Sequence, residues 1–372
     1  MVGGATFRLA ETIIEIQGDH PVVNNINHEL APNKIKKESP NIVFKLSTDP
    51  LPNIPSNIVG VGPVFATEER AWLHLDAVGF RLLITFSDDL SQPIDVRVQI
   101  QEKNFRNLLP ATISRWRTRT FITPLEQMGY AFINGILETM LMLFGKQTAM
   151  IHASSIEHSG ETILFPSTGG TGKTTLSLLL VSRHGFNYLA DDISLVSPEG
   201  LAYFYPRYVM MYPYSLQGLS NIESVFLQGR SPSDRFHWNL GKRLFGPKGV
   251  RRRVPPHDLY KNNIIDKAPI GRVYFLVRHP ANDFSITRVS PSRIAEMSSH
   301  ILLTEYSYYI NYLRYWEATG EAPFKIESLR QKWIGVYKEA FSTVRDISII
   351  RIPIHASPLE LEKYFLDVFK NG

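Results

Sequence analysis

The sequence predicts an α/β protein of two domains, with a β-rich domain over residues 1–120 and a domain of alternating strands and helices over residues 121–372. Three observations predict this division. Short runs of β-branched and aromatic residues fill the first part, and a helix-start signal follows at Thr123. Further on, a glycine-rich loop joins a predicted strand to a predicted helix, as in α/β domains.

The composition is that of an ordinary globular protein. The 372 residues are 44% apolar and 20% charged, and none of them is cysteine. The lack of cysteine excludes a disulfide framework, a zinc ribbon and thiol chemistry. Residues 1–6 have neither the basic segment nor the apolar run of a signal peptide, so we expect a cytoplasmic protein.

The first 120 residues are predicted to form short strands separated by turns rich in Pro, Asn, Asp and Gly. Residues 87–93 are expected to connect the last two strands as a hairpin. We assign this domain to the binding of a substrate or partner. The predicted strands cover residues 13–16, 42–46, 80–86 and 94–100.

A helix is predicted from Pro124 to about Phe144, at the junction of the two domains. Thr123 can cap its first turn, and Glu126 stands three residues after this cap, where its side chain can complete a capping box. Gly145 is expected to end the helix.

This helix contains the most apolar stretch of the chain, residues 128–145. Its length would suit a membrane span, but Asn134 and Glu138 interrupt it. We therefore predict a buried amphipathic helix and no membrane partner.

The remaining elements alternate between strands and helices. Strands are predicted at 149–156, 162–165, 188–190, 193–196, 202–209, 271–277 and 347–352, and helices at 173–183, 291–316, 323–343 and 358–370. The aromatic residues from Tyr203 to Tyr214 fit a substrate or nucleobase surface and a half-buried strand equally well.

The loop from Ser167 to Thr174 follows the phosphate-binding pattern G-x-x-x-x-G-K-[ST], with serine in place of the first glycine. Its glycines let successive backbone N–H groups turn inward toward phosphate oxygens, and the following helix adds the positive end of its dipole. Lys173 supplies a charge for the β- and γ-phosphates, and the Thr174 hydroxyl can bind Mg²⁺. The residues expected to hold the nucleotide are Ser167, Thr168, Gly169, Gly170, Thr171, Gly172, Lys173, Thr174 and Thr175.

Two aspartates, Asp191 and Asp192, follow Lys173 by 18 and 19 residues and stand between two short predicted strands. One carboxylate of such a pair can hold Mg²⁺ while the other takes a proton from an attacking hydroxyl. A charged β-turn is the alternative interpretation.

His152 precedes the loop by 15 residues and lies on the preceding predicted strand. If the two strands are antiparallel neighbours, its imidazole comes near the γ-phosphate end of the site and can pair with an aspartate.

These three features together resemble the HPr kinase/phosphorylase family and its kinase relatives. In that family a histidine stands one strand ahead of a G-x-x-G-x-G-K-[ST] loop. An Asp pair then follows in the context Gly-aromatic-x-x-hydrophobic-x-Asp-Asp, which residues 185–192 match. The resemblance covers about residues 148–200, and a weaker likeness at 268–272 extends it toward residue 280.

The resemblance implies an HPr-kinase/PEP-carboxykinase-like P-loop fold for the C-terminal domain, with ATP and Mg²⁺ as cofactors. It implies Asp191 as the general base aided by His152, with Asp192 and Thr174 at the metal. It also implies that the protein can form a homo-oligomer. The Arg-Gly-rich signature of true HPr kinases is missing, so we expect a diverged member whose substrate is not the phosphocarrier HPr.

The formal net charge of +5 is concentrated in one segment. Residues 229–253 contain eight basic residues and one acid, a charge of +7, which leaves −2 for the rest of the chain. Within this segment we expect a clamp for the phosphates or for an acidic substrate, and a solvated loop is the alternative. One local segment does not predict nucleic-acid binding. The expected clamp residues are Lys248, Arg251, Arg252 and Arg253.

The sequence thus predicts an ATP- and Mg²⁺-dependent kinase that transfers the γ-phosphoryl group to a hydroxyl, with a serine of a peptide or protein as the expected acceptor. Two alternatives stay open. One is a nucleotide-sensing binding module without transfer. The other is a kinase or phosphorylase acting on a small molecule.

Overall fold

The computed structural model describes residues 4–86, 92–101, 123–216, 219–260 and 262–371. They form a mixed α/β structure, as predicted. The contacts divide the chain into two compact units. The first unit comprises Met1–Lys146 and Tyr306–Gln331, and the second comprises Gln147–Glu305 and Lys332–Gly372.

These units differ from the predicted division at residue 120. The predicted junction helix packs within the first unit, where the rings of Phe44 and Phe132 meet edge to face with centroids 5.3 Å apart. A segment late in the chain also returns to this unit, since Trp316 packs its ring 5.8 Å from that of Phe86. Apolar faces pack against apolar surfaces that the folded chain brings near them, whatever their distance along the sequence. A change in local sequence character therefore does not locate the boundary between the two units.

The first unit contains one eight-stranded sheet in the order β1-β2-β3-β8-β7-β6-β5-β4. The pairs β2–β3 and β3–β8 are parallel and the others are antiparallel. The predicted pairing of the last two strands as a hairpin is confirmed by β7 and β8, and residues 87–91 of their connection lie outside the described residues. The strands are β1 Ala5–Leu9, β2 Thr12–Gly18, β3 Ile42–Ser47, β4 Val59–Val61, β5 Val64–Thr67, β6 Arg70–Leu75, β7 Phe80–Thr85 and β8 Ile94–Ile100.

Helices accompany this sheet, including α1, which the β-rich prediction missed. The junction helix begins as predicted, because the Thr123 hydroxyl accepts a hydrogen bond from the Glu126 N–H at 3.1 Å. Its middle is a π-helical turn, η3, and the buried Glu138 that follows accepts a hydrogen bond from the Tyr306 hydroxyl. The helices are α1 Pro21–Leu30, α4 Pro124–Ala131, η3 Phe132–Leu137, α5 Glu138–Phe144 and α11 Ser307–Ala318.

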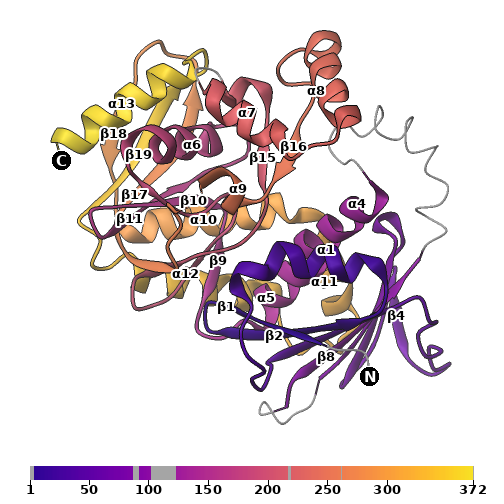
Figure 1. Ribbon diagram of the computed structural model, residues 1–372. Helices are drawn as coiled ribbons and strands as arrows, with labels where there is room; N and C mark the ends of the chain where they lie inside the picture. The colour runs from indigo at the N-terminus through magenta and orange to yellow at the C-terminus, as the bar shows by residue number, and fades with distance from the viewer. Residues whose placement is uncertain (1–3, 87–91, 102–122, 217–218, 261, 372) are drawn as a thin grey trace. The chain divides into compact units, whose positions relative to one another are not determined.

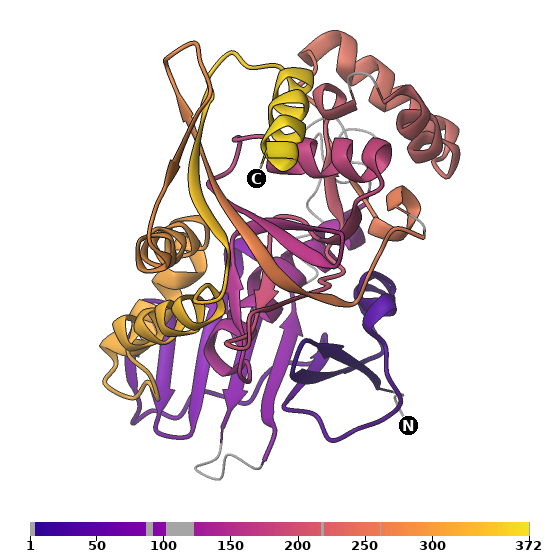
Figure 2. The same cartoon turned by 90° about the vertical axis from the view of Figure 1, so that its left-hand side faces the viewer.

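The second unit is built on a mixed sheet with the path β12-β10-β11-β17-β14-β13-β9, to which β19 and β18 are added beside β17. The long strand β17 runs parallel to both β11 and β19, and Figure 2 shows it extending beside β19. The strands are β9 Ala149–Ile151, β10 Ala153–His158, β11 Glu161–Pro166, β12 Asn187–Ala190, β13 Ser194–Val196, β14 Leu201–Tyr203, β17 Lys267–His279, β18 Ser285–Arg288 and β19 Asp346–Pro353. A separate ribbon pairs β15 Val209–Met211 with β16 Arg252–Val254.

Helices α6 and α13 pack together over this sheet (Figure 1), where Arg183 of α6 and Glu362 of α13 form an ion pair at 2.8 Å. The core between these helices and the sheet is apolar. Alternate residues of the strands, such as Ile163 and Phe165 of β11, pack into it. The helices are α6 Lys173–His184, α7 Ser220–Gln228, α8 Pro232–Phe245, α9 Pro256–Tyr260, α10 Pro291–Glu305, α12 Ile326–Ala340 (which begins in the first unit) and α13 Pro358–Asn371.

Three predicted elements are each divided in the structure. The strand predicted at 149–156 breaks at His152 into β9 and β10, which pair with different strands. The strand predicted at 202–209 is β14 followed later by β15, and the helix predicted at 291–316 is α10 and α11, separated at Tyr306. Over the described ranges, no helix has the length and apolar character needed to cross a membrane.

Helix α6 positions the glycine-rich loop, so its packing can be tested by one substitution. Leu178 is fully buried in the core under this helix. We expect Leu178→Ala to lower the free energy of unfolding by about 2–5 kcal/mol, because it removes apolar contacts and leaves a cavity. Urea unfolding followed by tryptophan fluorescence measures the loss. The matched control is Leu244→Ala, because Leu244 is 59% exposed and should change stability by about 0.5 kcal/mol or less. Equal losses in the two variants would contradict the described core.

Candidate functional site

The glycine-rich loop lies between the end of β11 and the start of α6. Gly170 and Gly172 take left-handed backbone conformations with φ of 79° and 107°, which a side chain would disfavour. A Cβ on Gly172 would also stand 3.1 Å from the Leu361 side chain. The N-cap residue of α6 is Gly172, and among the described residues no side chain caps this helix start, which adjoins the loop. This is the backbone arrangement that binds anions.

Serine at position 167 is compatible with this loop. Among the described residues other than glycine, positive φ occurs only at Ala10, Gln147, Ser159 and Asp192, so Ser167 adopts a conformation open to any residue. Its hydroxyl oxygen lies 2.5 Å from that of Thr171, and this contact crosses the loop.

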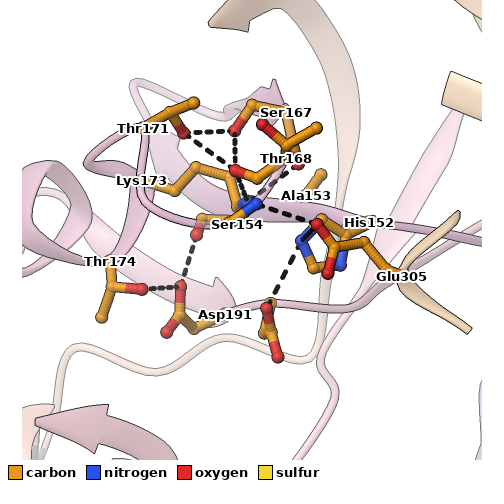
Figure 3. A network of polar contacts seen from close by, with 12 residues as sticks. His152, Ala153, Ser154, Ser167, Thr168, Thr171, Lys173, Thr174, Asp191 and Glu305 are labelled. Carbon is orange, nitrogen blue, oxygen red and sulfur yellow. Dashed lines mark hydrogen bonds and ion pairs between the residues drawn. The ribbon is translucent and has the colours of Figure 1, made fainter. Parts of the chain in front are cut away.

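Lys173 is buried inside the curve of the loop. Its ammonium group donates hydrogen bonds to the backbone oxygens of Ser167 at 2.9 Å and Thr168 at 3.1 Å (Figure 3). Burial lowers the pKa of the Lys173 ammonium, while the neighbouring carboxylates of Asp192, Asp191 and Glu305 act to raise it. The charge is therefore held inside the glycine-rich loop with several carboxylates close by.

Asp191 is buried beneath the loop and bonded to two hydroxyls. Ser154 donates to its Oδ1 atom, and Thr174 donates to the same atom at 3.1 Å (Figure 3). Burial and the neighbouring Asp192 raise the pKa of the Asp191 carboxyl, whereas the two hydroxyl donors and Lys173 act to lower it.

Asp192 points to a different set of neighbours. Its left-handed backbone, with φ of 70°, is rare outside glycine and turns its side chain away from that of Asp191. Its Oδ2 atom lies 2.9 Å from Nη2 of Arg207, and its Oδ1 atom lies 3.5 Å from Nε2 of His152. Partial burial acts to raise the pKa of the Asp192 carboxyl, but Arg207, His152 and Lys173 together lower it to about 2. This carboxylate is therefore ionised at neutral pH.

His152 occupies the break between β9 and β10, and its side chain is only 5% exposed. Neither ring nitrogen has a hydrogen-bond partner in the described part of the chain, and Nε2 faces Asp192 and, at 3.9 Å, Glu305. Burial and the nearby Lys173 lower the pKa of His152 to about 4, against the opposing effect of Asp192 and Glu305. The imidazole is thus neutral at physiological pH.

Each of the two aspartates contacts the group that the sequence prediction had placed beside the other one. Asp191, expected to be the base beside His152, is bonded to Thr174, and Asp192, expected at the metal with Thr174, lies beside His152. The reason is local. Adjacent residues point in different directions, and the left-handed conformation of Asp192 fixes which of them faces the histidine.

Two charged residues of this cluster were not predicted. Arg207 pairs with Asp192, and its charge within the aromatic run after Tyr203 was the available signal. Glu305 approaches the loop from the end of α10, and nothing in the local sequence marks it.

The predicted basic clamp is dispersed. The guanidinium of Arg251 donates to the Tyr212 hydroxyl at 3.0 Å, and that of Arg253 lies over the Tyr208 ring. Arg252 forms a buried ion pair with Asp234 at 2.8 Å, in the core of the ribbon and α8. Of the four residues, Lys248 lines a cavity beside the loop.

That cavity has a volume of about 560 Å³ and opens next to the start of α6. Arg278, which was also not predicted, donates to the backbone oxygen of Pro353 at 2.7 Å on its wall, and burial lowers the pKa of this guanidinium. The walls therefore combine an aromatic ring, two basic side chains and apolar surface. The lining residues are Gly170, Gly172, Thr175, Tyr214, Pro247, Lys248, Arg278, Ile354, His355, Ala356, Ser357, Pro358 and Leu361.

The oxygen atoms at Asp191 fit a magnesium site. Mg²⁺ in phosphate-binding sites takes one or two protein oxygens together with waters and substrate phosphates. A buried carboxylate 3.1 Å from the Thr174 hydroxyl, beside the glycine-rich loop, fits this pattern. No group of three or more His, Asp or Glu side chains able to hold a metal occurs within the described ranges, so a protein-only metal cage is not present there.

Comparison with known proteins adds little to this geometry. A scan against protein-family models found no match, and a search of curated proteins found no similar sequence. Among solved structures, the chain is similar to the Hpr(Ser) kinase/phosphatase from Coxiella burnetii, with 12% sequence identity and a TM-score of 0.27, over 60% of this chain and 99% of that one.

The low pKa of His152 predicts a pH-dependent stability. At pH 7 the imidazole is neutral in the folded chain and mostly neutral in the unfolded chain. Below the unfolded value of 6.5 the unfolded chain takes up a proton that the folded site, with its pKa of about 4, does not. The folded state should therefore lose about 2 kcal/mol between pH 7 and pH 5 through this group.

Urea unfolding at the two pH values measures this loss, which His152→Gln should remove. The exposed His158 provides the matched variant, His158→Gln, which should keep the wild-type pH response. An unchanged pH response in His152→Gln would contradict the described environment of the imidazole.

Proposed function

We propose that the protein is an ATP- and Mg²⁺-dependent kinase that transfers the γ-phosphoryl group to a hydroxyl. One observation supports this proposal above the others. Within one unit, a glycine-rich loop of the phosphate-binding sequence pattern stands beside two carboxylates with different surroundings, one bonded to the loop threonine and one beside a neutral histidine. Binding of phosphates alone does not require the second carboxylate, whereas transfer to a hydroxyl needs a group that accepts its proton.

In this proposal the triphosphate lies along the loop. The N–H groups at the start of α6 and the ammonium of Lys173 hold its phosphates. The nucleoside extends into the adjacent cavity, where Tyr214 offers an aromatic face and Lys248 and Arg278 offer positive charge. This cavity is large enough for a nucleoside, since small-ligand pockets begin at about 300 Å³.

The metal would be held by Asp191 and the Thr174 hydroxyl. When bound there, Mg²⁺ would neutralise negative charge on the phosphates. The Ser154 hydroxyl, which also donates to Asp191, orients the carboxylate and stabilises its ionised form.

In the proposed transfer step, Asp192 accepts the proton of the acceptor hydroxyl. The acceptor oxygen attacks the γ-phosphorus and forms a new P–O bond. The bond from this phosphorus to the β–γ bridging oxygen breaks, and its electron pair stays on the ADP leaving group. The acceptor proton passes to the Asp192 carboxylate. Arg207 fixes the direction of this carboxylate, and His152 lies 3.5 Å from its other oxygen.

For the acceptor we propose the serine hydroxyl of a peptide or protein. Asp192 is partly exposed, so a chain segment can approach it from solvent. The second unit would hold the whole reaction, and the β-rich first unit would bind the substrate or a partner. A small-molecule hydroxyl meets the same chemical requirements.

Lys173→Ala should abolish nucleotide binding, because it removes the buried charge at the phosphate turn. Isothermal titration calorimetry with Mg²⁺ and ATP measures this loss. Lys338→Ala is the matched control, since Lys338 is exposed on α12 of the same unit and should leave the affinity unchanged. Undiminished ATP affinity in Lys173→Ala would exclude the loop as the phosphate site.

Asparagine substitutions separate the two aspartates. Asp192→Asn should keep ATP affinity near the wild-type value and lower transfer of labelled phosphate from γ-labelled ATP into cell extract by about 10²–10⁴-fold, because the proton acceptor is lost. Asp191→Asn should instead weaken the binding of Mg²⁺ and ATP by at least about 10-fold, since it alters the oxygens that hold the metal. If transfer proceeds at the normal rate in Asp192→Asn, the base is wrongly assigned. Tight ATP binding with no labelled product in the wild type would favour a nucleotide-sensing module.

A further inference from the structure

Glu305 reaches the phosphate loop from a distant part of the sequence. It is the last residue of α10, and its Oε1 atom accepts a hydrogen bond from the Gly169 N–H at 2.9 Å. The same oxygen lies 3.9 Å from Nε2 of His152 (Figure 3). An anionic oxygen is therefore already bonded to a backbone donor of the loop that is proposed to bind phosphate.

The position of Glu305 is unfavourable for its own helix. A carboxylate at the C-terminus of a helix meets the negative end of the helix dipole, and the last turn of α10 contains no basic residue. The compensating contacts come from the loop and its surroundings. Because its carboxylate lies beside the site, Glu305 acts to raise the pKa values of both Lys173 and His152. Its side chain is 32% exposed.

The proposed nucleoside cavity lies at one end of the site, and Glu305 lies at the other end. The proposed nucleoside cavity is lined by Gly170, Gly172 and Thr175, whereas Gly169 donates to Glu305, which in turn lies beside His152. In the proposed reaction the γ-phosphate is the phosphate beside Asp192 and His152, so it would lie closer to Glu305 than the β-phosphate would.

We propose that Glu305 determines how the site discriminates between nucleoside triphosphate and diphosphate. Its carboxylate competes with the terminal phosphate for the Gly169 N–H and repels its charge, so it lowers the affinity for the triphosphate more than that for the diphosphate. This inference rests on the proposed function, because it assumes that the loop binds nucleotide phosphates. Glu305 is in this sense a specificity-determining residue, with no part in the proton transfer.

The test compares two ligands in the full-length protein. Glu305→Gln retains an oxygen acceptor for the Gly169 N–H and removes the charge. Calorimetry with Mg²⁺ measures the affinities for ADP and for an ATP analogue with an imide group between its β- and γ-phosphates. In Glu305→Gln the affinity for the triphosphate analogue should rise by at least about fivefold, the gain expected from removing a like charge about 4 Å away. The affinity for ADP should change by less, so the ratio of the two affinities should shift toward the triphosphate.

Glu296→Gln is the matched control. Glu296 is an exposed residue of the same helix, nine positions earlier and so about 14 Å along the axis, and its substitution removes the same charge. Its affinity ratio should equal that of the wild type. An unchanged ratio in Glu305→Gln, or equal gains for both ligands, would overturn the inference while leaving the nucleotide site intact. Failure of the wild type to bind either ligand would instead refute the proposed function itself.

Discussion

Strand β10 pairs with β11 on one side and with β12 on the other, antiparallel in both cases, and the site depends on this pairing. The register sets Ala153 opposite Pro166 and Ser155 opposite Ala190. The start of β10 and the ends of its two neighbours therefore meet at one edge of the sheet. His152, the glycine-rich loop and the Asp pair each follow or precede one of these strand ends. A backbone hydrogen bond from Ser167 N–H to the His152 oxygen, at 3.3 Å, links two of them directly.

The backbone conformation at this edge of the sheet also determines which neighbours the charged side chains of the site contact. Gly170 and Gly172 take left-handed conformations in the loop, and the left-handed Asp192 has its carboxylate beside His152 and Arg207. Adjacent aspartates thereby enter two environments. Asp191 is buried with hydroxyl donors, and Asp192 is partly exposed with a cation. Separation of two acidic groups by their surroundings is the arrangement by which a metal ligand and a proton acceptor can coexist.

Much of this site could be predicted from the sequence because its signals are local. The spacing of Gly170, Gly172 and Lys173 between a strand and a helix reflects backbone requirements that few other residues meet. The capping of α4 by Thr123 and the β7–β8 hairpin were predicted for the same reason. The contacts of the two aspartates could not be predicted, because they depend on backbone conformation such as the left-handed φ of Asp192.

Local sequence patterns could not predict contacts between residues that are far apart in the sequence. Glu305 follows Gly169 by 136 residues, and only the packing of α10 brings the two together. The basic segment, residues 229–253, shows the opposite effect. Its residues are close together in the sequence but have different partners in the structure. Arg252 pairs with Asp234, and the guanidinium groups of Arg251 and Arg253 lie against the Tyr212 and Tyr208 rings, so these three arginines contact their own surroundings. The unit boundary was displaced because residues 306–331 return to the first unit.

The central claim is that the site transfers a phosphoryl group to a hydroxyl and does not merely bind or hydrolyse ATP. Phosphorus NMR of the purified protein incubated with ATP, Mg²⁺ and cell extract tests this claim most directly. The proposed reaction predicts a phosphomonoester resonance that grows in equal amount with ADP and is absent with Asp192→Asn. Formation of ADP with inorganic phosphate alone, or of no product at all, would contradict it.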